Sequence, residues 1–286
     1  MRWVTHKRIT FLIVSSKFRF LFNNKEFIDG LSDGLIEPDI YPDIYLSGAI
    51  GVPHHTIRAN KLVEYYACLS LYFLRNDRHY DSGKALGRAI HYIQDMTFDI
   101  GKPFLKFYHD QFEEEVNRIS EDKAYLRDII DEVTTTDDLT EIAKVKKAKV
   151  PKDAVREATK RTYQLLSWFV SESERPIDLS TILRKLRVVK VAKAIASTIA
   201  VTMILWIIDR LLQSFGGLVK FFLTGISYAL NPEYQIGATI FLLLFSSFIV
   251  GICYAVVSSI KGIRTKVHWE AFKAGVLKID FEGAIY

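Results

Sequence analysis

The chain has 286 residues, 49% of them hydrophobic and 25% charged, and 38 basic residues against 33 acidic ones give a net charge of +5. This hydrophobic share excludes an intrinsically disordered chain, and so small a net charge does not by itself indicate a nucleic-acid-binding protein. The two cysteines, Cys68 and Cys253, lie far apart in the sequence, which excludes a disulfide framework and a cysteine-based zinc site.

The first 185 residues predict an all-helical domain, because alternating strand patterns are scarce. The basic start is followed by an apolar run, residues 10–14, that is too short for a secretory signal peptide, so we expect the domain to stay on the side where it is made. Residues 24–55 are rich in glycine and proline and predict a loop-rich stretch. Apolar residues at helical spacing predict helices over residues 60–74, from a cap at Ser82 to about residue 97, over 104–133 and over 151–170.

Two apolar segments in the second half of the chain predict membrane spans, and the mean hydropathy of +0.11 is high for a soluble protein. Residues 236–260 carry no charge and are numerous enough to cross a bilayer. The first span, about residues 191–208, is shorter, but Lys190 and Lys193 can extend along the helix to the interface and lengthen it. Between the spans, residues 211–230 predict an interfacial or re-entrant helix, with a third span as the alternative.

Basic residues flank this membrane region on both sides and predict its orientation. They precede the first span and follow the second, whereas few lie between the spans, so both ends are expected in the cytoplasm. The sequence therefore predicts a cytoplasmic helical domain over residues 1–185, an integral, multi-pass membrane region over 186–260 and a C-terminal tail over 261–286. The predicted fold class is all-α, a helical bundle followed by a C-terminal transmembrane helical hairpin.

The most specific chemical motif is the pair formed by His91 and Asp95. Four residues apart on a helix, the two side chains share one face and can reach one metal ion. Asp99 continues that face, and His109 with Glu113 repeats the spacing on the next predicted helix. One such pair is usually a salt bridge or a cap, but two pairs on antiparallel helices favour a zinc site in a bundle core.

Other histidines and carboxylates in the first half supply further candidate ligands, and six of the seven histidines lie within the first 109 residues. Of the adjacent His54 and His55, one is expected to bind a metal, and the other to lie in the loop or to support the first. Asp39 and Asp43 follow prolines. A turn and a metal ligand are about equally favoured for Asp39, and a turn is favoured for Asp43.

Residues 86–95, LGRAIHYIQD, resemble the central motif of the zinc-dependent phospholipase C family, whose members are all-helical bundles related to the single-strand-specific zinc nucleases. The similarity covers roughly residues 1–175 and keeps the family's order along the chain. Its other elements, each weak alone, are Trp3–His6, Gly34–Asp39, His54 or His55, and Phe107–Glu113. The resemblance implies a helical bundle of the zinc-dependent phospholipase C type with two or three zinc ions.

Carried over position by position, the resemblance also implies a set of zinc ligands. They are His6, Asp39, His54 or His55, His91, Asp95, His109 and Glu113. Asp95 is expected to bridge two ions, and Asp39 to serve also as the catalytic general base.

The chain departs from the family at two positions. Trp3 is internal, whereas secreted members use the amine of a processed N-terminal tryptophan as a ligand. Gly101 replaces a family histidine, and Asp99 stands at a family proline, where it can substitute as an oxygen ligand.

These observations predict a membrane-anchored zinc-dependent phosphodiesterase, in which a metal-activated water hydrolyses phospholipid headgroups or another phosphodiester. The expected partners are the lipid bilayer and this substrate, and no nucleic acid partner is expected. Two alternatives stay open: a catalytically inactive membrane scaffold that keeps the bundle fold, favoured by Gly101 and the internal Trp3, and a zinc-dependent nuclease.

Overall fold

The computed structural model describes residues 1–41, 43, 59–98, 106–223 and 265–277. Most of these residues lie in helices and none lies in a β-strand; the one bridge recorded within these ranges joins Phe98 to Ala148. The predicted all-α class is therefore confirmed. The chain divides into two compact units, the first made of Met1–Ile177 with the residues from Trp269 onward, and the second of Asp178–His268.

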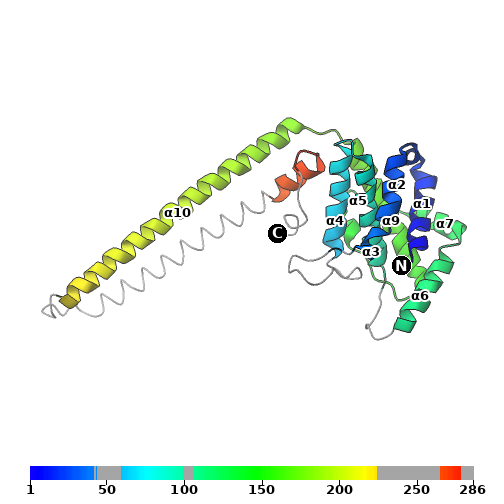
Figure 1. Cartoon of the computed structure of the whole chain (residues 1–286), viewed down its shortest axis with the longest axis horizontal. Coiled ribbons are helices and arrows are strands. Elements are labelled where there is room, and N and C mark those ends of the chain that lie inside the picture. Colours follow the sequence, from blue (N-terminus) through cyan, green and yellow to red (C-terminus); the bar gives the residue numbers. More distant parts are fainter. Residues whose placement is uncertain (42, 44–58, 99–105, 224–264, 278–286) are drawn as a thin grey trace. The chain divides into compact units, whose positions relative to one another are not determined.

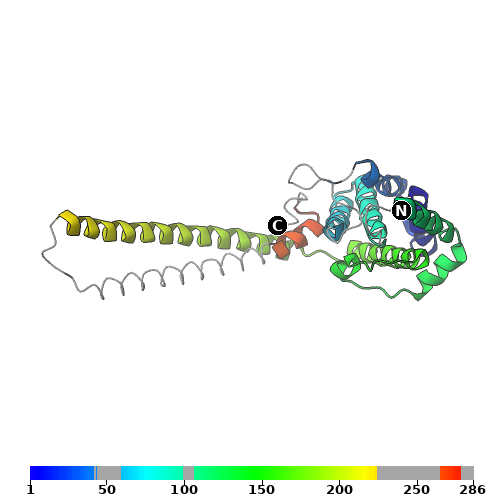
Figure 2. The ribbon, with the colours of Figure 1, turned by 90° about the horizontal axis from the view of Figure 1, so that it is seen from below.

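The first unit is a bundle of helices (Figure 1). In chain order they are α1 (Trp3–Lys17), the 3-10 helix η1 (Arg19–Asn23), α2 (Lys25–Gly34), α3 (Glu37–Ile40), α4 (Ala59–Leu74), α5 (His79–Asp95), α6 (Lys106–Ile119), α7 (Lys123–Glu132), α8 (Leu139–Ala143) and α9 (Pro151–Glu174). The central helix is α5, which lies between α2 and α4 and also packs against α9 (Figures 1 and 2). Every residue from Ala89 to Asp95 is buried, so polar side chains at this end of α5 are enclosed by the bundle.

Four glycines bring the backbones of α2 and α5 into contact. They are Gly30 and Gly34 on α2, and Gly83 and Gly87 on α5. A Cβ atom added to Gly30 would lie 2.0 Å from the Tyr80 carbonyl oxygen, and one added to Gly83 would lie 1.9 Å from the Phe27 carbonyl oxygen. No larger residue fits there, because the obstructing atoms belong to the backbone of the packed partner helix. The contact holds the C-terminal end of α2, and the chain that follows it, against α5.

Two predictions about the first half of the chain are wrong. Residues 25–40, predicted as loop, form α2 and α3, because Gly30 and Gly34 serve a helix contact and not turns. Ser82, predicted as a helix cap, lies inside α5 and is buried against α4. Its hydroxyl donates to the Ser70 carbonyl at 2.9 Å, and the Ser70 hydroxyl donates to the Ser82 carbonyl at 2.8 Å. These bonds satisfy two buried hydroxyls at the interface of the two helices.

The pattern over residues 104–133 corresponds to two described helices, α6 and α7. A new helix starts after Asp122, because its carboxylate accepts hydrogen bonds from the backbone N–H groups of Ala124 and Tyr125. The helix predicted over residues 60–74 is confirmed as α4. The helix predicted over 151–170 is confirmed as α9, which begins at a proline, a residue that suits the first helical turn.

The segment that follows Trp269 rejoins the first unit and packs against α4. Phe272 is fully buried, and its ring centroid lies 5.9 Å from that of Tyr65. The guanidinium of Arg75 donates a hydrogen bond to the backbone carbonyl of Lys273. The chain therefore leaves the first unit once and later returns to the same hydrophobic core.

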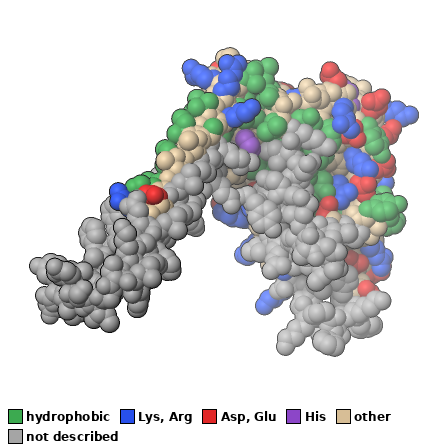
Figure 3. Space-filling view, turned by 60° about the vertical axis from the view of Figure 1, so that its left-hand side comes forward, with side chains coloured by type: hydrophobic (Ala, Val, Ile, Leu, Met, Phe, Trp, Pro, Cys, Tyr) green, Lys and Arg blue, Asp and Glu red, His purple; other side chains and the backbone are tan. Residues whose placement is uncertain are grey.

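The second unit is described mainly by α10 (Leu179–Leu223), a continuous helix of 45 residues. It contains the predicted span at 191–208 and runs without a break through Gly216 and Gly217. Basic side chains gather near its start, with hydrophobic ones further along (Figure 3). Among the residues that the structure describes, no helix combines the length and the apolar character needed to cross a membrane. The predicted span at 236–260 lies outside the described residues.

Replacing Gly83 with alanine is expected to destabilise the protein by about 1–3 kcal/mol, because the new methyl group would collide with the backbone of α2. At an ordinary helix position the same change stabilises a helix by roughly 0.5–1 kcal/mol, so the sign of the change is informative. Urea unfolding followed by circular dichroism measures it, with Asp29→Ala on the exposed face of α2 as the control. An alanine variant as stable as the original chain would contradict the backbone contact.

Candidate metal centre

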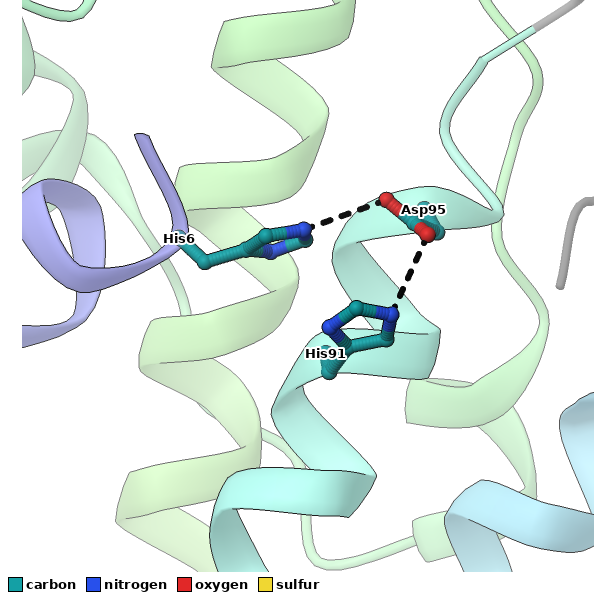
Figure 4. Close-up of side chains that lie close together, drawn as sticks. All are labelled: His6, His91 and Asp95. Atoms are coloured by element: carbon teal, nitrogen blue, oxygen red, sulfur yellow. Dashed lines mark ion pairs between the residues drawn. The ribbon is translucent and has the colours of Figure 1, made fainter. Parts of the chain in front are cut away.

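Two histidines and an aspartate converge inside the first unit (Figure 4). His6 comes from α1, and His91 and Asp95 come from α5, one helical turn apart. The Nε2 atom of His6 lies 3.3 Å from Asp95 Oδ1, and the Nε2 atom of His91 lies 3.3 Å from Asp95 Oδ2. All three side chains are buried, and one ligand atom from each lies within 4.8 Å of the other two. The group can therefore hold a metal ion.

The buried face of α1 directs His6 toward α5. His6 shares that face with Thr10 and with apolar residues at helical spacing. The ring centroids of His6 and His91 are 4.4 Å apart, and the ring planes are inclined by 23°. Two protonated rings at this distance would repel each other, so the stack requires at least one neutral imidazole.

The ring of His91 is oriented by a backbone carbonyl. Its Nδ1 atom lies 2.9 Å from the carbonyl oxygen of Leu35, the residue that follows α2. Because a carbonyl oxygen only accepts, Nδ1 carries the proton, and in the neutral ring Nε2 carries the lone pair. In its neutral form, the form that can bind a metal ion, His91 therefore directs this lone pair at the carboxylate of Asp95.

The ring of His6 is oriented in the same way by Gln94. Its Nδ1 atom lies 2.6 Å from Gln94 Oε1. The amide nitrogen of Gln94 donates to the hydroxyls of Thr10 at 3.2 Å and Thr162 at 2.9 Å, and in this orientation of the amide Oε1 faces His6. His6 therefore donates through Nδ1 and also directs an Nε2 lone pair at Asp95, an arrangement typical of metal-binding histidines.

The distances in this group suit a divalent metal ion. A separation of 3.3 Å between Nε2 and a carboxylate oxygen is longer than the usual hydrogen bond of about 2.9 Å. It matches the edge, roughly 3.3 Å, of a tetrahedron whose centre is a zinc ion about 2.0–2.1 Å from each ligand. The Nε2 atom of His6 is fully buried and makes no hydrogen bond to a described residue. This nitrogen is therefore available as a ligand, and two imidazoles with a carboxylate are a donor set that zinc accepts.

Asp39 of α3 extends the group on the side of His91. Its Oδ1 atom lies 3.5 Å from His91 Nε2, and its Oδ2 atom accepts a hydrogen bond from the indole N–H of Trp3 at 2.6 Å. The Asp39 side chain is 31% exposed, against 3% for Asp95, so solvent reaches the group at Asp39. Trp3 thus orients the carboxylate that lies between His91 and water.

The α-amino group of Met1 extends the group on the side of His6. It lies 2.8 Å from Asp95 Oδ1 and 3.0 Å from Glu113 Oε1 on α6. Burial opposes the charge of this amine, but the two carboxylates outweigh burial and raise its pKa above the usual value. Two donor sets thus meet at the Asp95 carboxylate. The Met1 amine and His6 lie at Oδ1, with Glu113 beside the amine, and His91 lies at Oδ2, with Asp39 beside the imidazole.

The two histidines differ in their affinity for protons. Burial opposes the charge of His91, but Asp95 and Asp39 outweigh burial and raise the pKa of His91 to about 9. The pKa of His6 is lowered, first by burial and then by the neighbouring His91. Without a metal ion, His91 is protonated and His6 is neutral near pH 7.

The structure brings together five of the residues predicted from the sequence: His6, Asp39, His91, Asp95 and Glu113. His109 lies in α6, but its side chain is not among those described. The predicted ligands His54, His55 and Asp99 lie outside the described residues.

Three further groups were not predicted from the sequence: the Met1 amine, Gln94 and the indole of Trp3 as the partner of Asp39. Asp43 accepts hydrogen bonds from the hydroxyls of Tyr66 and Tyr92 and from Arg88, and the residues on either side of it, on which its predicted turn depends, lie outside the described residues. None of these contacts follows from a local motif. Two signals could have drawn attention: the glutamine directly before the motif aspartate, and the amine ligand of the family that the motif resembles.

Comparison of the sequence with protein-family models and curated proteins, and of the fold with solved structures, finds no match. The geometry of the site therefore carries the functional argument.

Replacing Gln94 with leucine is expected to weaken zinc binding by roughly 10–100-fold, because His6 loses the acceptor that fixes its tautomer. Competition with a fluorescent zinc chelator measures the affinity. Gln164→Leu on α9 is the control, since that side chain donates to the Thr134 carbonyl, away from the cluster. Equal affinities in the two variants would show that Gln94 does not orient a ligand.

The metal-free protein is expected to lose stability as the pH rises from about 6.5 through about 9. The pKa of His91 is higher in the folded state than in the unfolded state, so protonated His91 stabilises the fold. This contribution, roughly 3 kcal/mol, is complete below the pKa of the unfolded state and is lost above the pKa of the folded state. The Met1 amine, also raised, acts in the same direction. Urea unfolding in the presence of a chelator measures the effect. His91→Gln should flatten the dependence, and stability that rises through this window would contradict it.

Proposed function

We propose that the first unit is a zinc-dependent phosphodiesterase of the phospholipase C kind, which hydrolyses phospholipid headgroups at a membrane surface. The observation that carries the proposal is that two imidazole Nε2 atoms face opposite oxygens of one buried carboxylate, Asp95. A carboxylate in this position can bridge two metal ions, and paired ions are common in enzymes that cleave phosphate esters. The resemblance of residues 86–95 to the zinc-dependent phospholipase C family supports the same donor set.

In this proposal His6, His91 and Asp95 hold zinc. Asp39, Glu113 and the Met1 amine would complete the two donor sets. When bound, zinc lowers the pKa of a water ligand to about 7, and its positive charge stabilises the phosphate oxygens. The Leu35 carbonyl and the Gln94 amide keep the ring nitrogens of His91 and His6 directed inward. Since both oriented rings are enclosed by the bundle, the donors are in place before a substrate arrives.

Asp39 is the group best placed to accept a proton. One of its oxygens accepts from Trp3, and the other faces the cluster. Burial favours the neutral acid, but the hydrogen bond and charge of His91 outweigh burial and lower the pKa of Asp39. Asp39 is therefore ionised at neutral pH and open to solvent, which suits a general base acting on an attacking water.

We also propose that residues 186–260 attach the protein to a membrane as a helical hairpin, with the first unit on the cytoplasmic side. Exposed apolar side chains along α10, among them Val188, Val191 and Ile195, support contact with lipid. The first unit contains the chain both before and after this region, so the region must begin and end on the same side of a bilayer. That constraint favours an even number of membrane crossings and disfavours three.

A metal-free structural role is the second candidate, and the ion pairs of the site favour it. The amine of Met1 and a protonated His91 provide positive charge for the carboxylates of Asp95, Asp39 and Glu113. The bundle can therefore fold around this group without a metal ion and serve as a membrane scaffold. Metal content separates the two candidates.

The full-length protein is expected to hold two or three zinc ions and to release phosphorylated headgroup from phospholipid vesicles. A chelator should abolish the release, and added zinc should restore it. His91→Ala and Asp95→Asn should each lower the rate by at least about 100-fold, because each removes a ligand. Metal analysis and a headgroup-release assay measure the two quantities.

The control for this experiment is His79→Ala, on the same helix but about 18 Å from His91 along its axis. It should keep both zinc and activity. Zero or one tightly held ion would favour the scaffold. Full activity in metal-stripped protein would exclude the proposal, and cleavage of single-stranded nucleic acid in place of phospholipid would favour a nuclease.

A further inference from the structure

A lysine-rich segment, residues 144–152, lies on the surface of the first unit between α8 and the start of α9. Its sequence is KVKKAKVPK, and all five of its lysines are exposed. Lys144 pairs with Glu141 at 2.6 Å, whereas the ammonium groups of Lys147 and Lys149 make no ion pair with any described residue. The segment therefore presents concentrated positive charge that the described part of the protein does not neutralise.

The backbone of this segment is fixed to the end of α5. The N–H group of Ala148 donates to the Thr97 carbonyl at 2.8 Å, and Ala148 forms a parallel bridge with Phe98. The N–H group of Lys146 donates to the Glu157 carboxylate on α9 at 3.4 Å. Since Thr97 follows Asp95 by two residues, the lysines extend from a chain held at the same end of α5 as the candidate metal centre.

A surface hollow of about 410 Å³ lies beside these lysines. It is lined by Lys146, Lys147, Ala148, Lys149, Val150, Asp153, Arg156, Glu157 and Lys160. Arg161, which lies outside the lining, pairs with Glu157 at 2.8 Å, and Glu132, also outside it, pairs with Arg156 at 2.6 Å. Lys146, Lys147, Lys149 and Lys160 then remain against Asp153. Positive charge thus exceeds negative charge around the hollow, which suits a ligand with phosphate groups.

The side chains around the hollow favour a lipid surface over a nucleic acid. No aromatic residue is among those that line it, whereas single-stranded nucleic acid is usually held by stacking on aromatic rings. Val150, an apolar residue between Lys149 and Pro151, is 52% exposed. An exposed apolar side chain among lysines is typical of segments that lie in the headgroup region of a bilayer.

We propose that residues 144–152 bind the anionic headgroups of a phospholipid bilayer and so hold the α5 end of the bundle at the membrane surface. This inference deepens the proposed function by identifying the kind of surface that the enzyme contacts. It depends on the lysines and not on a metal ion, so its failure and the failure of the zinc chemistry are separate results.

Hydrogen–deuterium exchange of the full-length protein tests the proposal. The protein is reconstituted with nanodiscs of phosphatidylcholine alone, or with roughly one third phosphatidylserine. We expect amide exchange over residues 144–152 to slow by about fivefold or more with phosphatidylserine only, and the effect to disappear in high salt. The variant K146Q/K147Q/K149Q should lose the effect. The control R19Q/K25Q/K123Q, which removes the same charge from exposed positions elsewhere in the unit, should keep it.

Several results would overturn the proposal. One is equal amide exchange in the two kinds of nanodisc. The others are protection that persists in K146Q/K147Q/K149Q, and protection that is lost in R19Q/K25Q/K123Q as well. Protection by a single-stranded oligonucleotide but not by phosphatidylserine would overturn it in favour of nucleic acid. Zinc content and headgroup release, measured on the same samples, report on the proposed hydrolase separately.

Discussion

The backbone contact between α2 and α5 is the constraint on which the candidate metal centre depends. Helices usually pack with their axes about 8–10 Å apart because side chains separate them. At Gly30 and Gly83 there is no side chain to do so, and each glycine meets a carbonyl oxygen of the partner helix. The end of α2 thereby places the Leu35 carbonyl at Nδ1 of His91, and α3 places Asp39 at Nε2. The glycines therefore shape the site although they lie outside it.

The centre concentrates charge where little water can reach. A buried carboxylate such as Asp95 is unfavourable by several kcal/mol unless positive groups or hydrogen bonds compensate. Here two ring nitrogens and an amine surround it. A divalent cation could take the place of the protons on His91 and on the amine while the carboxylates keep their positions. The same arrangement thus suits a metal-free fold and a metal-bound one.

Local rules explain what could be foreseen from the sequence. Proximity of His91 and Asp95 follows from one helical turn, and the helix over residues 60–74 follows from its apolar spacing. Gly30 and Gly34 predict turns from the sequence but serve a helix contact, because glycine favours turns unless a partner helix offers glycines at matching positions. Gln94 acquires its role from threonines on α1 and α9, distant in sequence. The Met1 amine belongs to the backbone and carries no motif at all.

The return of the chain at Trp269 has a mechanical consequence. Phe272 is buried in the same core as the first helices, so residues 178–268 form a loop whose two ends are both fastened to one body. A proteolytic nick within the loop would leave two fragments that stay associated. Any tension on the loop would reach α4 directly through Phe272 and Arg75.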